Sequence, residues 1–326
     1  MAGSKHMNVG IVGLGIIGSR VAECLRRAGH HVFVWNRSAR AEPNFLASPR
    51  EVAEVATFIQ VFVRDSEALL AVMREMQPAL TKTHVVCAHS TVSVSAMKEA
   101  ARIADDVGAG FLDAPFTGSR TAAEKGELVY YVSGELVEQE KALPLLQASS
   151  KKVLTFGTKV GDATVLKIAT NLVSGGVVVA LAEALALAQA HGVEGAQLLE
   201  AFQNNANCSP LITMKLPAMM TSSYTAHFSL KNMLKDARYA QELAQEQALV
   251  TPVLEAAVNA MAQADAAGQG EMDYSVVFEN FRKHREAEAA RPRPKTKPLI
   301  TLKASKFTLA EDDEPEAVTP PKTRRP

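Results

Sequence analysis

Three glycines near the N-terminus have the spacing of a phosphate-binding loop. They lie in the run Gly13-Leu14-Gly15-Ile16-Ile17-Gly18, which fits the pattern G-x-G-x-x-G. In such a loop the first glycine permits a tight turn and the second lets backbone N–H groups approach a pyrophosphate. The third allows a helix and a strand to pack closely. The chemistry that this spacing indicates is the binding of a dinucleotide.

The segments on either side of the glycines are those that such a site requires. Asn8–Val12 is a short apolar strand, Ser19–Ala28 has a helical apolar pattern closed by Gly29, and His31–Trp35 reads as a second strand. The helix N-terminus would face the phosphates with unpaired N–H groups and its positive dipole end. This context predicts a dinucleotide cofactor site.

The residues after the second strand indicate which dinucleotide binds. An NAD site usually has Asp or Glu here to hold the ribose 2′-OH, whereas this chain has Asn36-Arg37-Ser38. Arg37 can pair bidentately with a 2′-phosphate, Ser38 can donate to it, and Asn36 cannot repel it. Arg40 would add positive charge, and the alternative is that Arg37 is a solvated turn residue. The pattern favours NADPH or NADP+ as the cofactor.

Strands continue to alternate with helices as far as about Phe156. The further strands that we expect are Thr57–Val63, His84–His89, Gly110–Pro115, Leu128–Ser133 and Lys152–Phe156. This alternation predicts an α/β fold of the Rossmann type, with a doubly wound, mostly parallel sheet. Ligands of such sheets bind outside the carboxyl ends of the strands. We therefore expect one edge to gather Gly13–Gly18, Val63–Asp65, Ser90–Ser93 and Thr117–Ser119.

From Asp162 the pattern becomes helical. A long Ala-rich helix is expected to about Ala190, and further helices at 196–204, 211–220, 230–247, 252–267 and 275–288. We predict a Rossmann domain at 7–161 that binds NADP. An all-α substrate and oligomerisation domain at 162–288 opens with the long interdomain helix. A tail at 289–326, rich in Pro, Lys, Arg, Thr and acidic residues, is predicted to be disordered.

Composition limits the partners of the chain. Lys plus Arg and Asp plus Glu each number 35, so there is no electrostatic case for nucleic acid or an anionic membrane. Three widely spaced cysteines argue against a disulfide framework and favour a reducing, cytoplasmic location. The first six residues contain no apolar signal region, and Met7 is the expected native start.

The apolar run Leu172–Ala190 has two competing interpretations. Gly175-Gly176, Glu183 and Gln189 interrupt it, which favours a buried core helix over a membrane span. Its Ala-, Leu- and Val-rich faces exceed what one small helical domain buries easily, so we expect a homodimer or homotetramer.

Four separated motifs carry a family resemblance. They are Gly13–Gly18, Asp113-Ala114-Pro115-Phe116-Thr117-Gly118-Ser119, Lys167-Ile168-Ala169-Thr170-Asn171, and Phe228-Ser229-Leu230 with Lys235-Asp236. In this order the chain resembles the β-hydroxyacid dehydrogenases, the 3-hydroxyisobutyrate dehydrogenase group, over roughly residues 7–283. Within that group it looks most similar to the glyoxylate/succinic semialdehyde reductases. The resemblance implies hydride transfer between NADP(H) and a small aldehyde- or keto-acid or its hydroxy acid.

The resemblance implies that Lys167 and Asn171 are catalytic. They are four residues apart on a predicted helix and so share a face. When a carbonyl is reduced, a positioned ammonium stabilises the alkoxide and supplies its proton, and a neutral lysine is the base in the reverse reaction. Burial would favour the neutral form. Asn171 would orient Lys167 and bond the substrate oxygen; the alternative is that Lys167 is a surface lysine.

The same resemblance implies the remaining contacts. Thr117, Gly118 and Ser119 would hold a substrate carboxylate, although they could equally form an ordinary turn into a helix. Ser90 would contact the substrate and Thr91 the cofactor, with helix capping as the alternative. The other expected cofactor contacts, in addition to the glycine loop and residues 36–38, are Val63, Phe228 and Lys235. Lys235 would close over the cofactor and substrate, or else be an exposed helix lysine. No metal is implied.

The chain departs from the family pattern in two groups of residues. Phe116, Thr117, Ser119 and Thr170 would line the acyl end of the pocket and affect substrate choice, whereas Arg64 would lie near the nicotinamide and His89 precedes Ser90. Arg120 could select a second carboxylate or be solvated. One alternative is an imine reductase-like enzyme, which usually has another residue in place of the lysine. The other is a catalytically silent NADP-binding scaffold that uses the charged tail for interactions. The presence of Lys167 argues against both.

Overall fold

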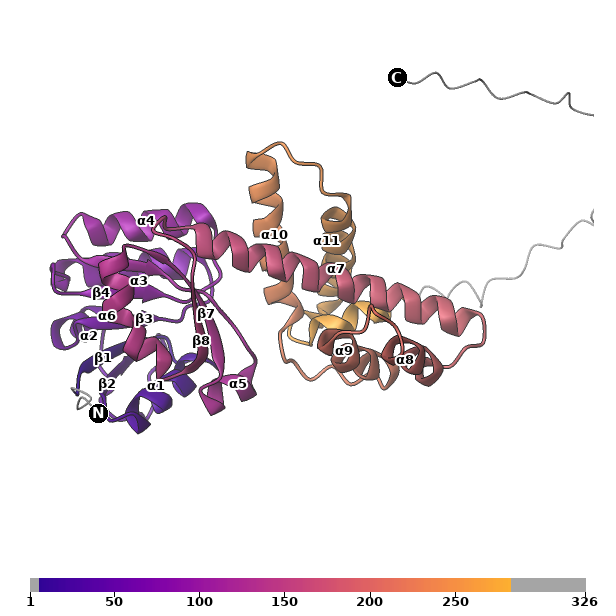
Figure 1. The fold of residues 1–326 in the computed structure, drawn as a ribbon, viewed down its shortest axis with the longest axis horizontal. Helices are drawn as coiled ribbons and strands as arrows, with labels where there is room; N and C mark the ends of the chain where they lie inside the picture. Colours follow the sequence, from indigo (N-terminus) through magenta and orange to yellow (C-terminus); the bar gives the residue numbers. More distant parts are fainter. Residues whose placement is uncertain (1–5, 283–326) are drawn as a thin grey trace, which may run out of the picture. The chain divides into compact units, whose positions relative to one another are not determined.

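The computed structural model describes residues 6–282, and their first half forms an eight-stranded sheet (Figure 1). The strand order is β2-β1-β3-β4-β5-β7-β6, with β8 also paired to β7. The strands are β1 (Asn8–Val12), β2 (His31–Trp35), β3 (Phe58–Val61), β4 (Val85–Ala88), β5 (Gly110–Asp113), β6 (Phe116–Thr117), β7 (Leu128–Gly134) and β8 (Ser150–Thr155).

The sheet is mostly parallel. Strands β1 to β5 pair in parallel, β7 runs antiparallel to β5 and β6, and β8 runs parallel to β7. Helices that follow the strands bring the chain back to start each parallel strand from the same end. The predicted doubly wound α/β fold is confirmed.

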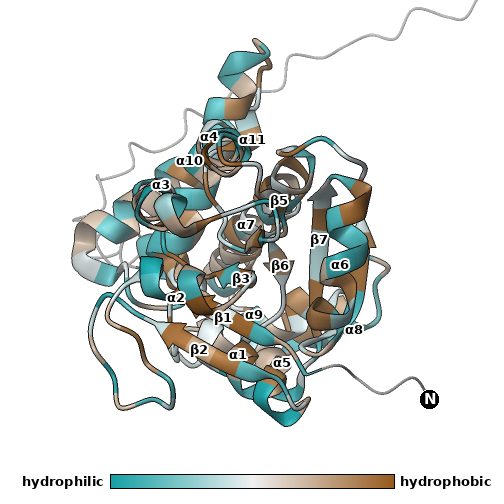
Figure 2. Ribbon diagram, turned by 90° about the vertical axis from the view of Figure 1, so that its left-hand side faces the viewer, coloured by the Kyte–Doolittle hydropathy of each residue, from teal (hydrophilic) through white to brown (hydrophobic). Residues whose placement is uncertain are grey.

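Helices cover both faces of this sheet because side chains alternate along each strand. Ile11 faces the core shared with α1 (Gly18–Arg27), α5 (Arg120–Lys125) and α6 (Leu136–Gln147). Val12, one residue later, faces the core shared with α2 (Pro49–Val55), α3 (Ser66–Met76) and α4 (Val94–Asp105). In Figure 2 strands β1 and β2 are mainly hydrophobic in colour. Strand β1 is buried from Val9 to Val12, as expected of a strand covered on both faces, whereas β2, at the edge of the sheet, alternates buried and half-buried residues after His31.

The second half is helical. It consists of α7 (Asp162–Ala190), α8 (Gly195–Gln203), α9 (Pro210–Met220), α10 (Leu230–Glu246) and α11 (Pro252–Ala264). Val178, Leu181 and Leu185 of α7 are buried against α9, α10 and α11. By length and composition alone α7 could cross a membrane, and 33% of its most apolar window is buried inside the protein. Among the described residues no strand follows β8, as predicted.

Two expected helices end differently in the structure. The helix expected over 252–267 stops at Ala264, and a looser turn follows in which Gly268 has a φ of +80°. The segment expected to be helical from Ser275 begins as a 3-10 turn, Tyr274–Val277, which Asp273 caps, and continues as helix to residue 282. The remainder of that expected helix and the predicted tail at 289–326 lie outside the described residues.

The strand expected over Gly110–Pro115 is also corrected. It ends at Asp113, because Pro115 has no N–H to donate to a ladder. Phe116–Thr117 then forms a separate short strand, antiparallel to β7. The sequence suggested that Thr117–Ser119 leaves a strand of the parallel sheet. In the structure this segment instead begins within the antiparallel strand β6.

Candidate active site

The glycine loop between β1 and α1 leaves room for a phosphate. Gly13 has a φ of +104°, and a Cβ there would overlap the carbonyl oxygen of Phe62. A Cβ on Gly18 would overlap the Gly13 carbonyl oxygen, so helix and loop pack directly on each other. Gly15 is different, since it is exposed and a Cβ there would meet nothing within 4 Å. No side chain caps the N-terminus of α1, so its N–H groups remain suited to an anion such as a pyrophosphate.

Asn36 ties this loop to the end of β2. Its Oδ1 accepts a hydrogen bond from Leu14 N at 3.0 Å, and its Nδ2 donates to the Ser38 carbonyl at 2.9 Å. The sequence pattern indicates only that Asn36 does not repel a phosphate; this structural role depends on the fold. Arg37 and Ser38 are exposed directly after the strand, where their side chains can meet a ligand.

Lys167 lies half-buried in the first third of α7. Burial disfavours its ammonium form and lowers its pKa from 10.5 to about 8. The negative charge of Asp236 opposes this shift, and the positive charge of Lys235 adds to it. A lysine with a pKa near 8 exchanges a proton readily at physiological pH, which is the property that an acid–base catalyst needs.

Asp236 holds a cluster of side chains beside Lys167 that consists of Asn171, Asp236 and Lys235. The sequence motif alone indicates no role for Asp236. It is 1% exposed on α10; its Oδ2 accepts from Asn171 Nδ2 at 2.7 Å and its Oδ1 from the Lys235 ammonium at 2.7 Å. The available signal was its position beside Lys235 in the same motif. A buried carboxylate that holds two predicted site residues fixes their side chains relative to Lys167.

Lys235 connects the cluster to the sheet domain. Its ammonium donates to the Thr91 carbonyl at 2.5 Å and lies 4.8 Å from the centre of the Tyr239 ring. Tyr239 in turn lies at hydrogen-bond distance from Ser66 Oγ, 3.0 Å away, at the start of α3. Helices α7 and α10 and the segment after β4 therefore meet at one place.

Ser90 links the segments that follow β3 and β4. It is buried, and its Oγ accepts from Val63 N at 2.8 Å. The residue that caps α4 is Ser93, whose Oγ accepts from Ala96 N at 3.2 Å. Capping as the alternative role of Ser90 and Thr91 is therefore wrong.

The expected carboxylate-binding segment is used partly to start a helix. Ser119 Oγ accepts from Ala122 N at 3.4 Å and caps α5. Gly118 has a φ of +138° and is exposed, and Thr117 is half-buried in β6. Hydrogen bonds and charge interactions connect Lys167, Asn171, Lys235 and Thr91. Within residues 6–282 no hydrogen bond joins Thr117, Gly118 or Ser119 to these residues.

His89 is buried directly after β4. Its Nδ1 lies 2.6 Å from the Ala114 carbonyl, and its ring stacks on Phe62 with 4.5 Å between ring centres. Burial lowers the pKa of His89 to about 4, so the ring is neutral at physiological pH. Phe116 packs against the same Phe62 ring at 6.2 Å, which makes a small aromatic wall beside the glycine loop.

The other departures from the family pattern have local partners. Arg64 is exposed and pairs with Asp65 at 2.8 Å. The Thr170 hydroxyl donates to the Lys167 carbonyl at 2.9 Å, within its own helix. Arg120 binds Glu124 at 3.0 Å on α5, and Glu124 also accepts from Arg20 of α1.

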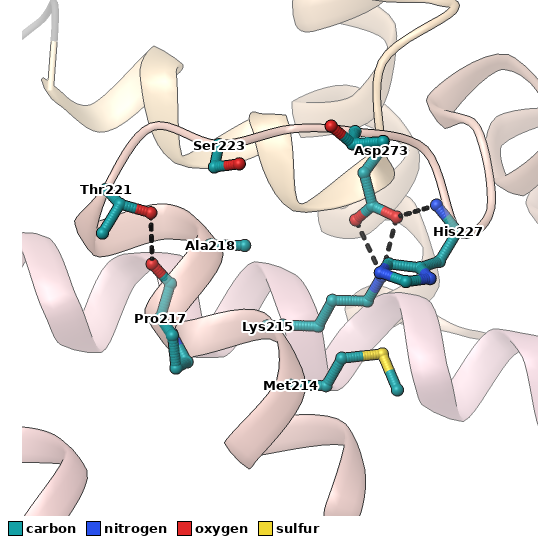
Figure 3. A pocket seen from close by; sticks show the side chains of 9 residues that line it. Met214, Lys215, Pro217, Ala218, Thr221, Ser223, His227 and Asp273 are labelled. Atoms are coloured by element: carbon teal, nitrogen blue, oxygen red, sulfur yellow. Dashed lines mark hydrogen bonds and ion pairs between the residues drawn. The ribbon is translucent and has the colours of Figure 1, made fainter.

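A surface hollow in the helical half lies around Lys215 (Figure 3). Lys215 and Asp273 are both buried and pair at 2.7 and 2.8 Å. Asp273 Oδ2 also accepts from the backbone N–H groups of His227 and Phe228. These charges satisfy one another, so the ion pair anchors the segment before α10 that contains Phe228. The hollow is therefore not a candidate active site.

Comparison with known families divides the chain where the sheet gives way to helices. Residues 8–157 match the family described as the NAD binding domain of 6-phosphogluconate dehydrogenase. Residues 161–280 match the family described as NAD-binding of NADP-dependent 3-hydroxyisobutyrate dehydrogenase.

Individual proteins agree with this pattern. The chain is 31% identical to the chloroplastic glyoxylate/succinic semialdehyde reductase 2 of Arabidopsis thaliana, over 87% of this chain and 82% of that protein. It is 29% identical to the cytokine-like nuclear factor N-PAC of Mus musculus, over 84% of this chain but only 50% of N-PAC. Among solved structures, the 3-hydroxyisobutyrate dehydrogenase of Mycobacterium tuberculosis with L-serine has a TM-score of 0.78 at 22% identity, over 85% of this chain and all of that one.

Proposed function

Because the chain belongs to the β-hydroxyacid dehydrogenase family, we propose that it is an NADPH-dependent reductase of small aldehyde- or keto-acids, of the glyoxylate or succinic semialdehyde type. Membership in the family establishes an oxidoreductase fold with a nicotinamide cofactor. The NADP preference, the substrate class and the role of Lys167 are our proposal. The observation that carries it is a lysine with a pKa of about 8 beside the Asn171–Asp236–Lys235 cluster.

The residues of the sheet domain suit NADPH. The unfilled space at Gly15 and the uncapped α1 fit the pyrophosphate, and exposed Arg37 and Ser38 fit the 2′-phosphate. Val63 and Thr91, in the segments after β3 and β4, are the proposed contacts toward the nicotinamide, with Phe228, just before α10, and Lys235 of α10. When bound, the nicotinamide supplies the hydride that reduces the substrate carbonyl.

Lys167 is the proposed general acid. At neutral pH its ammonium predominates, and it donates a proton to the oxygen of the carbonyl under reduction. In the oxidation of a hydroxy acid the neutral amine accepts that proton. Asn171, held by Asp236, orients Lys167 and bonds the same oxygen. Thr117, Gly118 and Ser119 are the proposed contacts for the substrate carboxylate, and Ser90 is a further proposed substrate contact.

One assay tests this proposal. NADPH oxidation is followed with glyoxylate, succinic semialdehyde, methylmalonate semialdehyde, tartronate semialdehyde and a cyclic imine. We expect turnover with at least one acid, its loss in Lys167→Ala, and NADPH binding in that variant close to that of the wild type. Turnover with no acid, or substantial turnover by Lys167→Ala, would contradict the proposal.

The cofactor preference has its own test. Arg37→Ala should raise the KM for NADPH far more than the KM for NADH, because only NADPH has a phosphate for Arg37 to bind. Arg50→Ala is a matched control, since Arg50 is exposed on α2 and pairs with Glu54 of the same helix. Equal effects of Arg37→Ala on the two cofactors would refute NADP specificity.

A catalytically silent scaffold is the second candidate function. The similarity to N-PAC, a cytokine-like nuclear factor, favours it. The intact Lys167–Asn171–Asp236 cluster favours the reductase. A chain that binds NADPH tightly but reduces nothing in the substrate panel would support the scaffold, and turnover of the imine alone would support an imine reductase.

Two further proposals concern assembly and location. Helix α7 leaves Val173 61% and Leu187 63% exposed, which favours a homodimer or homotetramer. A monomeric mass by light scattering at micromolar concentration would contradict this. The three free cysteines favour a cytoplasmic location, which cell fractionation tests.

A further inference from the structure

Helix α7 starts with hydrogen bonds to side chains of the sheet rather than to its own residues. Its N-cap residue is Gly161, which has no side chain to offer. Asp113, at the end of β5, accepts instead through Oδ2 from Gly161 N at 3.0 Å and Thr164 N at 2.9 Å. Ser133 of β7 accepts from Ala163 N at 3.2 Å and donates to the same Asp113 oxygen at 3.3 Å. Side chains of the sheet therefore accept from three N–H groups of the kind that a helix normally leaves unpaired at its start, while Asp162 N donates to the Lys159 carbonyl.

The second oxygen of Asp113 also binds α7. The Thr164 hydroxyl donates to Oδ1 at 2.7 Å, so Asp113 accepts from both the backbone and the side chain of Thr164. Asp113, Ser133 and Thr164 are all 0% exposed. Although Asp113 opens the motif that the family resemblance associates with substrate, its carboxylate is enclosed in protein and is already occupied by four donors.

Lys167 follows Thr164 by three residues and so lies less than one helical turn away. A bond to the Thr164 side chain fixes the rotation of the helix about its axis, and bonds to the first N–H groups fix its position along that axis. A slip of one residue would turn the Lys167 side chain by about 100° and move it about 1.5 Å. Displacements of about 1 Å at a reacting group can cost about a hundredfold in rate.

We propose that Asp113 is a positioning residue for the reaction: its ionised carboxylate caps α7 from the sheet and sets the place from which Lys167 delivers its proton. This inference rests on the proposed function, because it assigns Asp113 a task only if Lys167 is the acid. It predicts that an intact cap is needed for turnover and not for cofactor binding.

The proposal extends to pH because the cap requires a charged carboxylate. Burial raises the pKa of Asp113 to about 6, against the lowering effect of hydrogen bonds from Thr164, Gly161 and Ser133. Below that pH a proton occupies one of the oxygens that now accept bonds from α7. The reduction rate should therefore fall below about pH 6 as the cap weakens, and above about pH 8 as Lys167 loses its proton.

Other ionisable groups lie near this junction. Lys98 of α4 approaches Gly161, and Lys159 and Asp162 lie 4.0 Å apart at the start of α7. His89 reaches the carbonyl of Ala114, the residue after Asp113. Since the pKa of His89 is about 4, its ring stays neutral through the range in which Asp113 titrates.

Two variants weaken the cap of α7, and a third keeps it. In Asp113→Asn an amide NH2 replaces one acceptor and faces donors, and in Thr164→Val a methyl group replaces the hydroxyl at nearly constant volume. Thr164→Ser keeps the hydroxyl. Ser48→Ala is the control, because Ser48 caps α2 through one bond of 3.1 Å to Glu51 N, away from the cluster.

The test measures kcat, the KM for NADPH and the pH profile of reduction in these variants. We expect Asp113→Asn and Thr164→Val to lower kcat at pH 7 about tenfold or more, with the KM for NADPH within about twofold. Asp113→Asn should also lose the fall in rate near pH 6. Thr164→Ser and Ser48→Ala should keep most of the wild-type kcat. A wild-type kcat and pH profile in Asp113→Asn would overturn the proposal.

A second measurement does not depend on activity. Amide hydrogen exchange over residues 161–167 should be slow in the wild type at pH 7. It should be faster at the same pH in Asp113→Asn and Thr164→Val. Unchanged exchange would overturn the cap itself. Faster exchange with an inactive wild type would instead overturn the proposed function and with it the catalytic meaning of the cap.

Discussion

The pH dependence of carbonyl reduction should report the charges around Lys167. The pKa of Lys167 is lowered by burial, raised by Asp236 and lowered by Lys235. In Asp236→Asn the opposing charge is lost, so the pKa of Lys167 should fall further. In Lys235→Met the like charge is lost, so the pKa of Lys167 should rise. The two substitutions change adjacent residues and should move one titration in opposite directions.

The size of the effect follows from the protonated fraction of Lys167. With a pKa of about 8, about nine-tenths of the lysine carries its proton at pH 7. Loss of a nearby opposite charge is worth about one pKa unit at the low end of its usual range. The protonated fraction in Asp236→Asn would then be about half at pH 7. Reduction should be about twofold slower than wild type at pH 7 and about tenfold slower at pH 9, from protonation alone.

The shape of the profile separates charge from orientation. Asp236→Asn also disturbs the bond that holds Asn171, and that loss should lower kcat by the same factor at every pH. Protonation instead makes the ratio to wild type grow as pH rises. In the oxidation direction the sign reverses, because the neutral amine is needed and its fraction at pH 7 increases about fivefold.

The assay is steady-state NADPH oxidation from pH 5.5 to 9.5 at saturating substrate, with hydroxy-acid oxidation over the same range. Wild type, Asp236→Asn and Lys235→Met are compared, with Lys231→Met, which removes a lysine of α10 that pairs with Glu271, as the control. We expect the upper midpoint of reduction near pH 8 in wild type, lower in Asp236→Asn and higher in Lys235→Met. The same midpoint in all four proteins would refute the assignment of this titration to Lys167.

The remaining predictions concern the glycine loop and stability. Gly15→Ala should melt like the wild type but bind NADPH at least about tenfold more weakly, because its Cβ meets only the open space that a phosphate needs. Gly13→Ala should fold poorly, because Gly13 has a φ of +104° and its Cβ would overlap a backbone carbonyl. Calorimetry with a cofactor titration distinguishes the two variants. Lys215→Met leaves the buried carboxylate of Asp273 without its cation and should lower the free energy of unfolding in urea by about 3–5 kcal/mol. Lys231→Met breaks the exposed pair with Glu271 and should lower it by under about 1 kcal/mol. Similar losses in the two variants would contradict a stabilising role of the buried Lys215–Asp273 pair. Leu185→Ala should cost about 2–5 kcal/mol in the same experiment, since Leu185 is 0% exposed, and a loss below 1 kcal/mol would mean that the core of the helical half is loosely packed.

Local sequence patterns were sufficient for the fold class. Alternation of short apolar strands with amphipathic helices depends on neighbouring residues, so the parallel sheet and the later helices could be predicted. The errors occur where a distant partner or a single residue decides an end. Strand β6 exists because Phe116 and Thr117 pair with β7, and α11 stops at Ala264, shortly before Gly268.

The candidate site divides in the same way. The glycine spacing and Asn36-Arg37-Ser38 are local patterns. The sequence by itself therefore predicted a dinucleotide site and a preference for NADP(H) over NAD(H). Family motifs pointed to Lys167 and Asn171, but not to the reason for the lowered pKa of Lys167. That reason is burial, to which the positive charge of Lys235, 68 residues further along the chain, adds. The role of Asp113 likewise depends on Thr164, 51 residues away.

What the sequence determined about this protein is the kind of residue at each position and the local elements that carry it. What only the tertiary structure decided is which charges share a low-dielectric environment and which helix ends are satisfied from another element. The physical reason is that burial and hydrogen bonding act between residues that are close in space, whatever their separation along the chain. Lys167 becomes a candidate acid only when α7, capped by the sheet, packs beside α10.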